Sequence, residues 1–209
     1  MRRKILDAFN DRQKLQAKQT SGMPVVPIAP RDWQVSAASE LLNKRDTIVI
    51  TATGSGKSLS YLLASIANPG KILLAIFPLL SLMTDQVYYI KRIGGLYLLY
   101  GKQVAAANRL GIKSCRITYQ TLRNNPNLLR DIAQNQYELV CASPEFVTPE
   151  NKQFAFLLSN EKFRTNLLGI IIDEAHLCYI WFATLRQSVC AILILPGTRF
   201  DLSIDVWGC

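Results

Sequence analysis

A glycine-rich turn covers residues 51–58 and reads Thr-Ala-Thr-Gly-Ser-Gly-Lys-Ser. Residues 47–50 before it are mainly β-formers and predict a buried strand, whereas residues 60–67 after it have helical spacing. Gly54 and Gly56 allow the backbone to fold closely around an anion, and the N–H groups of the turn and of the helix start point at the same place. These residue types in this order are typical of a phosphate-binding loop.

The side chains that follow the turn can hold the rest of a nucleoside triphosphate. Lys57 would reach the β- and γ-phosphates, and the hydroxyl of Ser58 would bind magnesium. The strict form of this loop has glycine five residues before Gly56, where this sequence has Thr51. The alternative is a tight turn between a strand and a helix that contains these residues by chance. The nucleotide contacts that we assign to this segment are Thr53, Gly54, Ser55, Gly56, Lys57 and Ser58.

Two adjacent acids, Asp173 and Glu174, follow the apolar residues 167–172. An acid at the end of a buried strand beside a phosphate loop can hold magnesium through water, and the next acid can polarise the attacking water. We therefore expect Asp173 to bind the metal, Glu174 to act as general base and Lys57 to complete the catalytic set of an ATPase. Two such acids could equally begin a helix, but the phosphate loop upstream favours the ATPase.

Strand-like and helix-like segments alternate along the chain, which predicts a doubly wound α/β fold with a mainly parallel sheet. Asp32 can cap the first helix of this fold, whose Val35 and Ala38 would face inward. Gln34 near its start could read an adenine edge with one donor and one acceptor, although an exposed helical glutamine is the commoner case. The expected strands are residues 71–77, 112–118, 137–142 and 167–172, and the expected helices are residues 33–43, 127–134 and 149–158.

The net charge of +9 is concentrated in two segments. Residues 86–130 hold eight Lys and Arg and no acid, and residues 1–20 hold six against two acids. The first of these segments is what a face that binds a polyanion needs. We interpret residues 1–20 as a solvent-exposed charged helix or a partly disordered arm, and residues 20–30, with their three prolines, as an extended linker.

The cysteines and the apolar runs indicate the cellular compartment and bear on whether a zinc site or a membrane span is expected. Five cysteines without C-x-x-C spacing predict reduced thiols in a nuclear protein, with the cytoplasm as the alternative, and no zinc site. The apolar runs are far shorter than the ~20 residues of a membrane span, so no membrane partner is expected. The single histidine, His176, excludes mechanisms that need a histidine pair.

At this point the residues resemble a family. Asp173-Glu174-Ala175-His176 is similar to the DEAH form of the Walker B motif in superfamily-two helicases, and further segments resemble the RecQ-like DNA helicases. These segments are Arg31-x-x-Gln34, like the family's adenine-reading motif; Thr53–Ser58, like its phosphate loop; Pro78–Val87, like its DNA-contact motif after strand two; Ser143-Pro144-Glu145, like its T-P-E segment; and Trp181, like the tryptophan of its aromatic-rich loop.

The resemblance implies a RecA-like P-loop NTPase lobe that binds ATP and Mg²⁺. In that family a second lobe supplies arginines to the γ-phosphate, and closure of the cleft moves the protein three-prime to five-prime along single-stranded DNA. It implies further that Ser81, Asp85 and Gln86 lie near single-stranded or forked DNA, and that Trp181 couples DNA to the ATP site. The expected role is that of an ATP-dependent DNA helicase in recombination and repair.

The resemblance covers residues 31–181, which we take as the ATP-binding domain, with a basic arm and linker in residues 1–30 and an atypical tail in residues 182–209. After Trp181 the sequence departs from the family, and no T-A-T motif or second lobe follows. We therefore expect a truncated gene product or a faulty gene model that binds ATP without unwinding DNA. The alternatives are a non-catalytic module that binds ATP and nucleic acid, and a P-loop kinase, for which the sequence has no acceptor-site signature.

Overall fold

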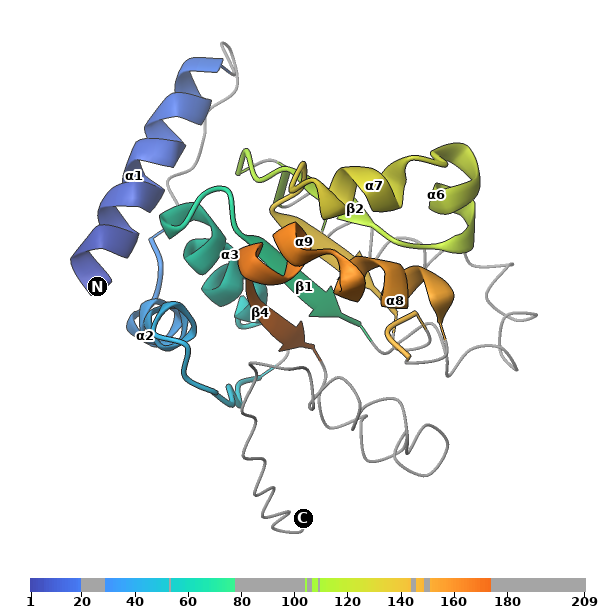
Figure 1. The fold of residues 1–209 in the computed structure, drawn as a ribbon. Coiled ribbons are helices and arrows are strands. Elements are labelled where there is room, and N and C mark those ends of the chain that lie inside the picture. Colours follow the sequence, from blue (N-terminus) through green and yellow to red (C-terminus); the bar gives the residue numbers. More distant parts are fainter. Residues whose placement is uncertain are drawn as a thin grey trace, which may run out of the picture.

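The computed structural model of the protein describes residues 1–19, 29–52, 54–77, 104, 107–108, 110–143, 146–148 and 151–173. Helices and strands alternate in these residues (Figure 1). In chain order the elements are α1 (Arg2–Gln19), α2 (Asp32–Leu42), α3 (Lys57–Ala67), β1 (Ile72–Ile76), β2 (Ser114–Arg116), α6 (Tyr119–Asn124), α7 (Leu128–Ala133), β3 (Leu139–Ala142), α8 (Lys152–Ser159), α9 (Glu161–Asn166) and β4 (Leu167–Ile172).

The strands form one parallel sheet in the order β2-β3-β1-β4. All five residues of β1, an interior strand, are buried, as expected for a strand that is covered on both faces. Because the strands are parallel, their carboxyl ends lie at one edge of the sheet, which is where open α/β sheets bind ligands. The predicted α/β fold with a parallel sheet is confirmed, and it agrees with a RecA-like lobe.

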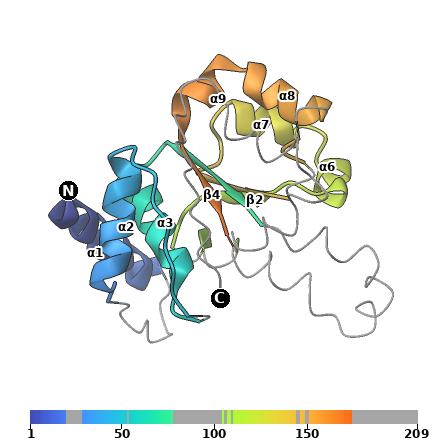
Figure 2. The same ribbon diagram turned by 90° about the horizontal axis from the view of Figure 1, so that it is seen from below.

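Helices cover both faces of this sheet. Figure 2 shows α1, α2 and α3 on one side and α7, α8 and α9 on the other. Side chains of β1 alternate between the two layers: Leu73 and Ala75 belong to a core with α1–α3, which we call the first core, whereas Ile72 and Leu74 belong to a second core with α7–α9. The period of two along a strand therefore divides one sheet between two hydrophobic cores.

The N-terminal helix α1 is part of the first core. Ile5 and Phe9, one turn apart, are both 0% exposed, and α1 packs against α2 and α3. Of the two sequence-based interpretations of residues 1–20, the charged helix is therefore confirmed, and it buries Ile5 and Phe9 whereas Leu15 is 54% exposed. Although α1 is 18 residues long, neither it nor any other helix in the described residues is apolar enough to span a bilayer.

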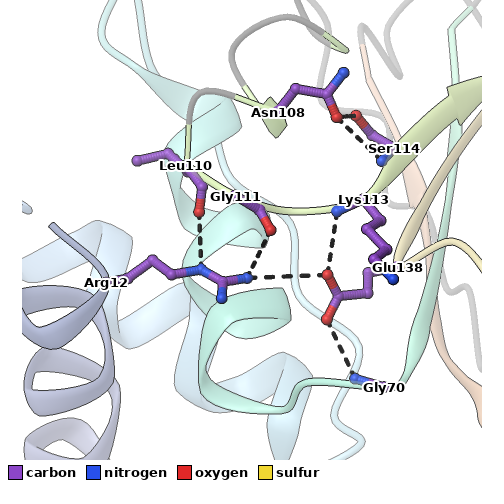
Figure 3. Close-up of polar contacts among 8 residues, drawn as sticks. All are labelled: Arg12, Gly70, Asn108, Leu110, Gly111, Lys113, Ser114 and Glu138. Carbon is purple, nitrogen blue, oxygen red and sulfur yellow. Dashed lines mark hydrogen bonds and ion pairs between the residues drawn. The ribbon is translucent and has the colours of Figure 1, made fainter. Parts of the chain in front are cut away.

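Arg12 ties α1 to the amino-terminal edge of the sheet (Figure 3). Its Nε and Nη2 atoms donate to the carbonyl oxygens of residues 110–111 at 2.9 and 2.8 Å. The carboxylate of Glu138 lies 4.0 Å from the same guanidinium and accepts the backbone N–H groups of Gly70 and Lys113, each at 3.2 Å. One carboxylate, only 16% exposed, thus joins α1, the turn after α3 and the approach to β2.

The strand predicted at residues 47–50 is wrong. These residues form no strand, and Ile48 and Ile50 are 73% and 90% exposed. An apolar β-former pattern gives a strand only where a neighbouring strand satisfies its backbone hydrogen bonds. Among the described residues β4 is the last strand at its end of the sheet, and none pairs with residues 47–50. The local pattern therefore has no partner to order it.

Strand β4 has the predicted ends, the other predicted elements in the described residues form with shifted ends, and two helices form that were not predicted. Asp32 is the first residue of α2 and Arg31 holds the cap position, so the predicted aspartate cap is wrong. The unexpected helices, α6 and α9, have six residues each, too few for a visible periodicity. Their starts are set by caps, because the side chains of Thr118 and Asn160 accept backbone N–H groups of the first turn.

Candidate nucleotide-binding site

The predicted phosphate turn has the backbone geometry that its glycines imply. Gly54 and Gly56 adopt φ angles of +78° and +86°, left-handed values that residues with a Cβ rarely adopt. Helix α3 starts directly after Gly56, at Lys57. The first N–H groups of a helix have no partner within it and carry the positive end of its dipole, so this helix start can bind an anion.

Gln34 joins the start of α2 to this turn. The residue is 4% exposed; its Nε2 donates to the carbonyl of Gly56 at 2.9 Å, and its Oε1 accepts the N–H of Arg31 at 2.8 Å. A Cβ on Gly56 would lie 2.9 Å from the same Nε2, so a larger residue would force the amide to move. The exposed-glutamine interpretation is thus wrong, and each end of the amide retains capacity for one more hydrogen bond.

Contacts within the turn hold Lys57 over it. The Nζ of Lys57 donates to the carbonyl of Thr51 at 3.4 Å, and the hydroxyl oxygens of Thr51 and Ser55 lie 2.7 Å apart. A guanidinium nitrogen of Arg31 donates to the carbonyl of Ser55 at 3.2 Å. Thr51, which stands where the strict loop pattern has glycine, therefore makes two contacts that close the turn. The long Lys57 contact is one that a phosphate oxygen could replace at little cost.

Asp173 follows β4 at the carboxyl edge of the sheet, as predicted. Its N–H donates to the carbonyl of Ile76 at 3.0 Å, which fixes it beside the end of β1. Tyr61 on α3 links this acid to the phosphate turn. Burial raises the pKa of Tyr61, a side-chain hydrogen bond with Ser58 opposes that shift, and the charge of Asp173 adds to it. The Tyr61 side chain thus hydrogen-bonds Ser58 and is under the electrostatic influence of Asp173.

The chemistry of these residues fits a magnesium-bound nucleotide. Mg²⁺ prefers oxygen ligands and usually takes one or two from protein side chains and the others from phosphates and water. Ser58 and Asp173 supply a hydroxyl and a carboxylate, whereas Lys57 and the N–H groups of the turn suit the phosphates. In the described part of the chain no group of three or more His, Cys, Asp or Glu could hold a metal ion. Phosphate oxygens and water would complete the magnesium shell, as they usually do for this ion.

Several predicted site residues lie outside the described residues, and their roles stay predictions. Glu174 and the nucleotide contact Thr53 are the two that belong to the ATP site. The residues expected near DNA are Ser81, Asp85, Gln86 and Trp181.

Sequence reasoning gave no role to Tyr61 and did not predict the contact of the Arg31 guanidinium with the turn. Tyr61 forms a side-chain hydrogen bond with Ser58, and Arg31 uses both its N–H and its guanidinium to hold Gln34 and the turn. The signal for Tyr61 was available, because it is three residues after Ser58 and therefore on the same face of α3. The contact of Arg31 with the turn crosses 24 residues and has no local signal.

Comparison with known proteins supports one family. The family model of the DEAD/DEAH box helicases matches residues 31–195, well over half of the 209-residue chain. The rat protein named ATP-dependent DNA helicase Q1 is 26% identical over 83% of this chain and 25% of its own length. The Haemophilus influenzae protein named ATP-dependent DNA helicase RecQ is 32% identical over 72% of the chain and 21% of its own length.

A third relative has a similar match. The Saccharomyces cerevisiae protein named ATP-dependent helicase SGS1 is 31% identical over 72% of this chain and 10% of its own length. The chain thus spans a quarter or less of these curated relatives. The residues that the family model matches include Gln34, the phosphate turn and Asp173. The chain belongs to the DEAD/DEAH box helicase family, and the relatives that it matches are RecQ-type helicases.

Proposed function

We propose that this chain is the ATP-binding first lobe of a RecQ-type DNA helicase that moves three-prime to five-prime. The observation that carries the proposal is the hydrogen bond from Gln34 to the Gly56 carbonyl at 2.9 Å. It joins two segments 22 residues apart, the proposed base-reading segment and the phosphate turn. A tight turn with no ligand role would not need a buried amide on its carbonyl.

Each residue of the site has a role in ATP binding or hydrolysis that follows from its chemistry. The turn and Lys57 bind the β- and γ-phosphates, and Gln34 uses its remaining donor and acceptor on the adenine edge. Ser58 and Asp173 hold Mg²⁺, which supplies charge neutralisation to the phosphates when it is bound. Glu174, the next residue, orients and deprotonates the attacking water. Tyr61 keeps the hydroxyl of Ser58 oriented toward the site.

The proposed substrate is single-stranded or forked DNA in the nucleus. Ser81, Asp85 and Gln86 contact the DNA in this proposal, and Trp181 transmits its binding to the ATP site. Hydrolysis at full rate needs arginines from a second lobe, because such an arginine raises NTP hydrolysis by about a thousandfold or more. We therefore expect the 209-residue chain by itself to bind ATP but not to unwind DNA.

Steady-state hydrolysis by the purified chain tests this proposal. ATP turnover should stay near background with and without single-stranded DNA, while equilibrium binding detects ATP. Turnover that DNA stimulates, and that Lys57→Ala removes, would show that these 209 residues suffice for hydrolysis.

A non-catalytic module that binds ATP and nucleic acid is the second possibility. The two proposals separate when the chain is mixed with a second lobe taken from one of the relatives. If it is the first lobe of a helicase, DNA-stimulated hydrolysis should appear in the mixture and depend on Asp173. If it is a module, ATP binding persists and no hydrolysis appears.

A further inference from the structure

Helix α2 connects the two edges of the sheet beside β4. Lys44, two residues after the end of α2, donates from its Nζ to the carbonyl oxygens of residues 167–168, where β4 begins. At its other end α2 carries Gln34, which contacts the phosphate turn, and β4 is followed by Asp173 at the carboxyl edge. The helix and the strand therefore run antiparallel, and each has one end in the ATP site.

A glycine in β4 allows α2 to lie close to this strand. A Cβ on Gly169 would lie 2.7 Å from Cδ1 of Leu41, which is closer than real Cβ atoms approach a neighbour. Glycine weakens the interior of a strand, and it often marks a place where another part of the chain approaches closely. The part that approaches Gly169 is α2.

Lys44 fixes the end of α2 to the start of β4. Its Nζ lies 3.3 Å from the carbonyl oxygen of Leu167 and 2.7 Å from that of Leu168. Its backbone has a φ of +59°, in the left-handed region where glycine usually follows a helix. Lys44 as a whole is exposed, but partial burial of its ammonium and the charge of Lys71 lower its pKa. The contact with β4 thus forms at both a conformational and an electrostatic cost.

The face of α2 that contacts β4 also contacts the phosphate turn. Gln34 and Leu41 are seven residues apart, which is about two helical turns, so their side chains share one face and lie about 10 Å apart. Between them, α2 buries Val35 and Ala38 in the first core. Because a closely packed helix transmits strain along its length, a change in the position of Leu41 on β4 shifts Gln34 relative to the turn.

We propose that Leu41, Lys44 and Gly169 are positioning residues for the adenine base of ATP. They fix α2 at a set distance from the strand that ends in Asp173. Gln34 can then meet the base while the metal and the phosphates occupy the other end of the site. This inference rests on the proposed function, in which Gln34 reads the adenine edge. It adds that the preference for adenine depends on contacts about two helical turns away from the base.

Equilibrium binding of two magnesium-bound nucleotides to the 209-residue chain measures this preference. Inosine triphosphate carries an oxo group where ATP has the amino group of its adenine, and its ribose and phosphates are the same. The ratio of the two dissociation constants reports how well Gln34 meets the base, whereas partial unfolding weakens both nucleotides alike. Gln34→Ala is the reference and should reduce the ratio about tenfold.

Gly169→Val tests the close approach of α2 to β4. The variant places a branched side chain against Leu41 and should reduce the ratio at least about threefold, because hydrogen bonds weaken steeply as their geometry degrades. Leu41→Ala, added to Gly169→Val, makes room for the valine and should raise the ratio again. This rescue distinguishes a displaced helix from a strand that is merely altered.

Lys44→Met tests the second contact, because it removes the ammonium and keeps a long side chain. It should also reduce the ratio at least about threefold, whereas Lys44→Arg keeps a donor and should bind both nucleotides as the unchanged chain does. Lys71→Met is the matched control. Lys71 donates to the carbonyl of Thr165 at 3.1 Å and to the Oδ1 of Asn166 at 3.0 Å, both on α9 and not on β4. Its loss should leave the ratio unchanged.

The outcomes separate this inference from the proposed function. If Gly169→Val and Lys44→Met keep the ratio of the unchanged chain while Gln34→Ala lowers it, the positioning role is wrong and the proposed function stands. If the unchanged chain binds both nucleotides equally, the base-reading role of Gln34 is wrong, and the positioning role with it. A chain that binds neither nucleotide would overturn the proposed function itself. If circular dichroism shows that Gly169→Val does not fold, Lys44→Met and Lys44→Arg decide the question.

Discussion

The two faces of the sheet are built from different kinds of sequence. The helices of the first face, α1, α2 and α3, have 18, 11 and 11 residues, and two of them begin in the nucleotide site. The helices of the second face, α7, α8 and α9, have six to eight residues. On the first face the helix starts are held by Gln34 and Gly56, whose groups also form the site. On the second face the side chains of Asn151 and Asn160 cap the helices.

This difference decides how readily a site on each face can be predicted from the sequence. A nucleotide site made of turn backbone and helix starts requires glycines and a lysine at fixed spacing, so its motif is visible in the sequence. Such a site can be predicted from the chain.

The largest effect should come from the contact of α1 with the first core. Phe9→Ala removes a ring that is 0% exposed and should lower the free energy of unfolding by about 3–5 kcal/mol. Leu15→Ala, on the same helix but 54% exposed, should change it by about 0.5 kcal/mol or less. Urea unfolding measures both. Equal, small effects would mean that α1 is not part of the first face.

The next effect separates backbone strain from the contact with Gln34. Gly56→Ala and Gly54→Ala both place a Cβ at positive φ, which costs about 1–2 kcal/mol. Only Gly56→Ala also pushes a Cβ to 2.9 Å from the Gln34 amide, because nothing lies within 4 Å of a Cβ on Gly54. Gly56→Ala should therefore be the more destabilising, and Gln34→Ala in the same chain should reduce the difference. Equal urea midpoints for the two glycine variants would contradict the contact between position 56 and the Gln34 amide.

Each face of the sheet buries a thiol that should make the free energy of unfolding depend on pH. Cys141 belongs to the first core and Cys115 to the second, and burial raises the pKa of both, that of Cys141 from 9.0 to about 12. An unfolded thiol ionises near pH 9 while the folded one stays protonated. Stability is thus unaffected below pH 9 and falls between pH 9 and 12, by about 1.4 kcal/mol per pH unit for each thiol.

The measurement is urea unfolding from pH 8 to pH 10.5 for the unchanged chain and for Cys141→Ala. Above pH 9 the variant should lose less stability per pH unit than the unchanged chain. The difference should equal the contribution of one thiol. Identical slopes would mean that Cys141 is accessible to solvent in the folded state.

The smallest effect is expected at the outer end of α1. Arg2 and Asp32 form an ion pair of 2.7 Å, but the Asp32 side chain is 99% exposed. Asp32→Asn should therefore change the free energy of unfolding by less than about 1 kcal/mol, and 0.5 M salt should remove the difference. A larger effect that persists in salt would assign α1 a role in positioning α2.

The elements that could be predicted from the sequence are those whose structure depends on residues close to them in the chain. β1, β3 and β4 were predicted because each is a short apolar run, and Asp173 was placed because it ends one of them. Residues 47–50 failed because a strand needs a neighbour, which no local pattern supplies. The burial of Phe9 depends on packing against α2 and α3, and the anchor made by Arg12 depends on residues about a hundred positions away.

The most direct test of the nucleotide site is equilibrium binding of magnesium-ATP to the unchanged chain, to Lys57→Ala and to Lys14→Ala. Lys14 is the matched control, since its side chain is 74% exposed on α1 and far from the turn in sequence. We predict that Lys57→Ala weakens binding at least about tenfold, as expected for a lost hydrogen bond to a charged group, and that Lys14→Ala binds as the unchanged chain does. Equal affinity of the three proteins, or no binding by the unchanged chain, would contradict the site built from Gln34, the phosphate turn and Asp173.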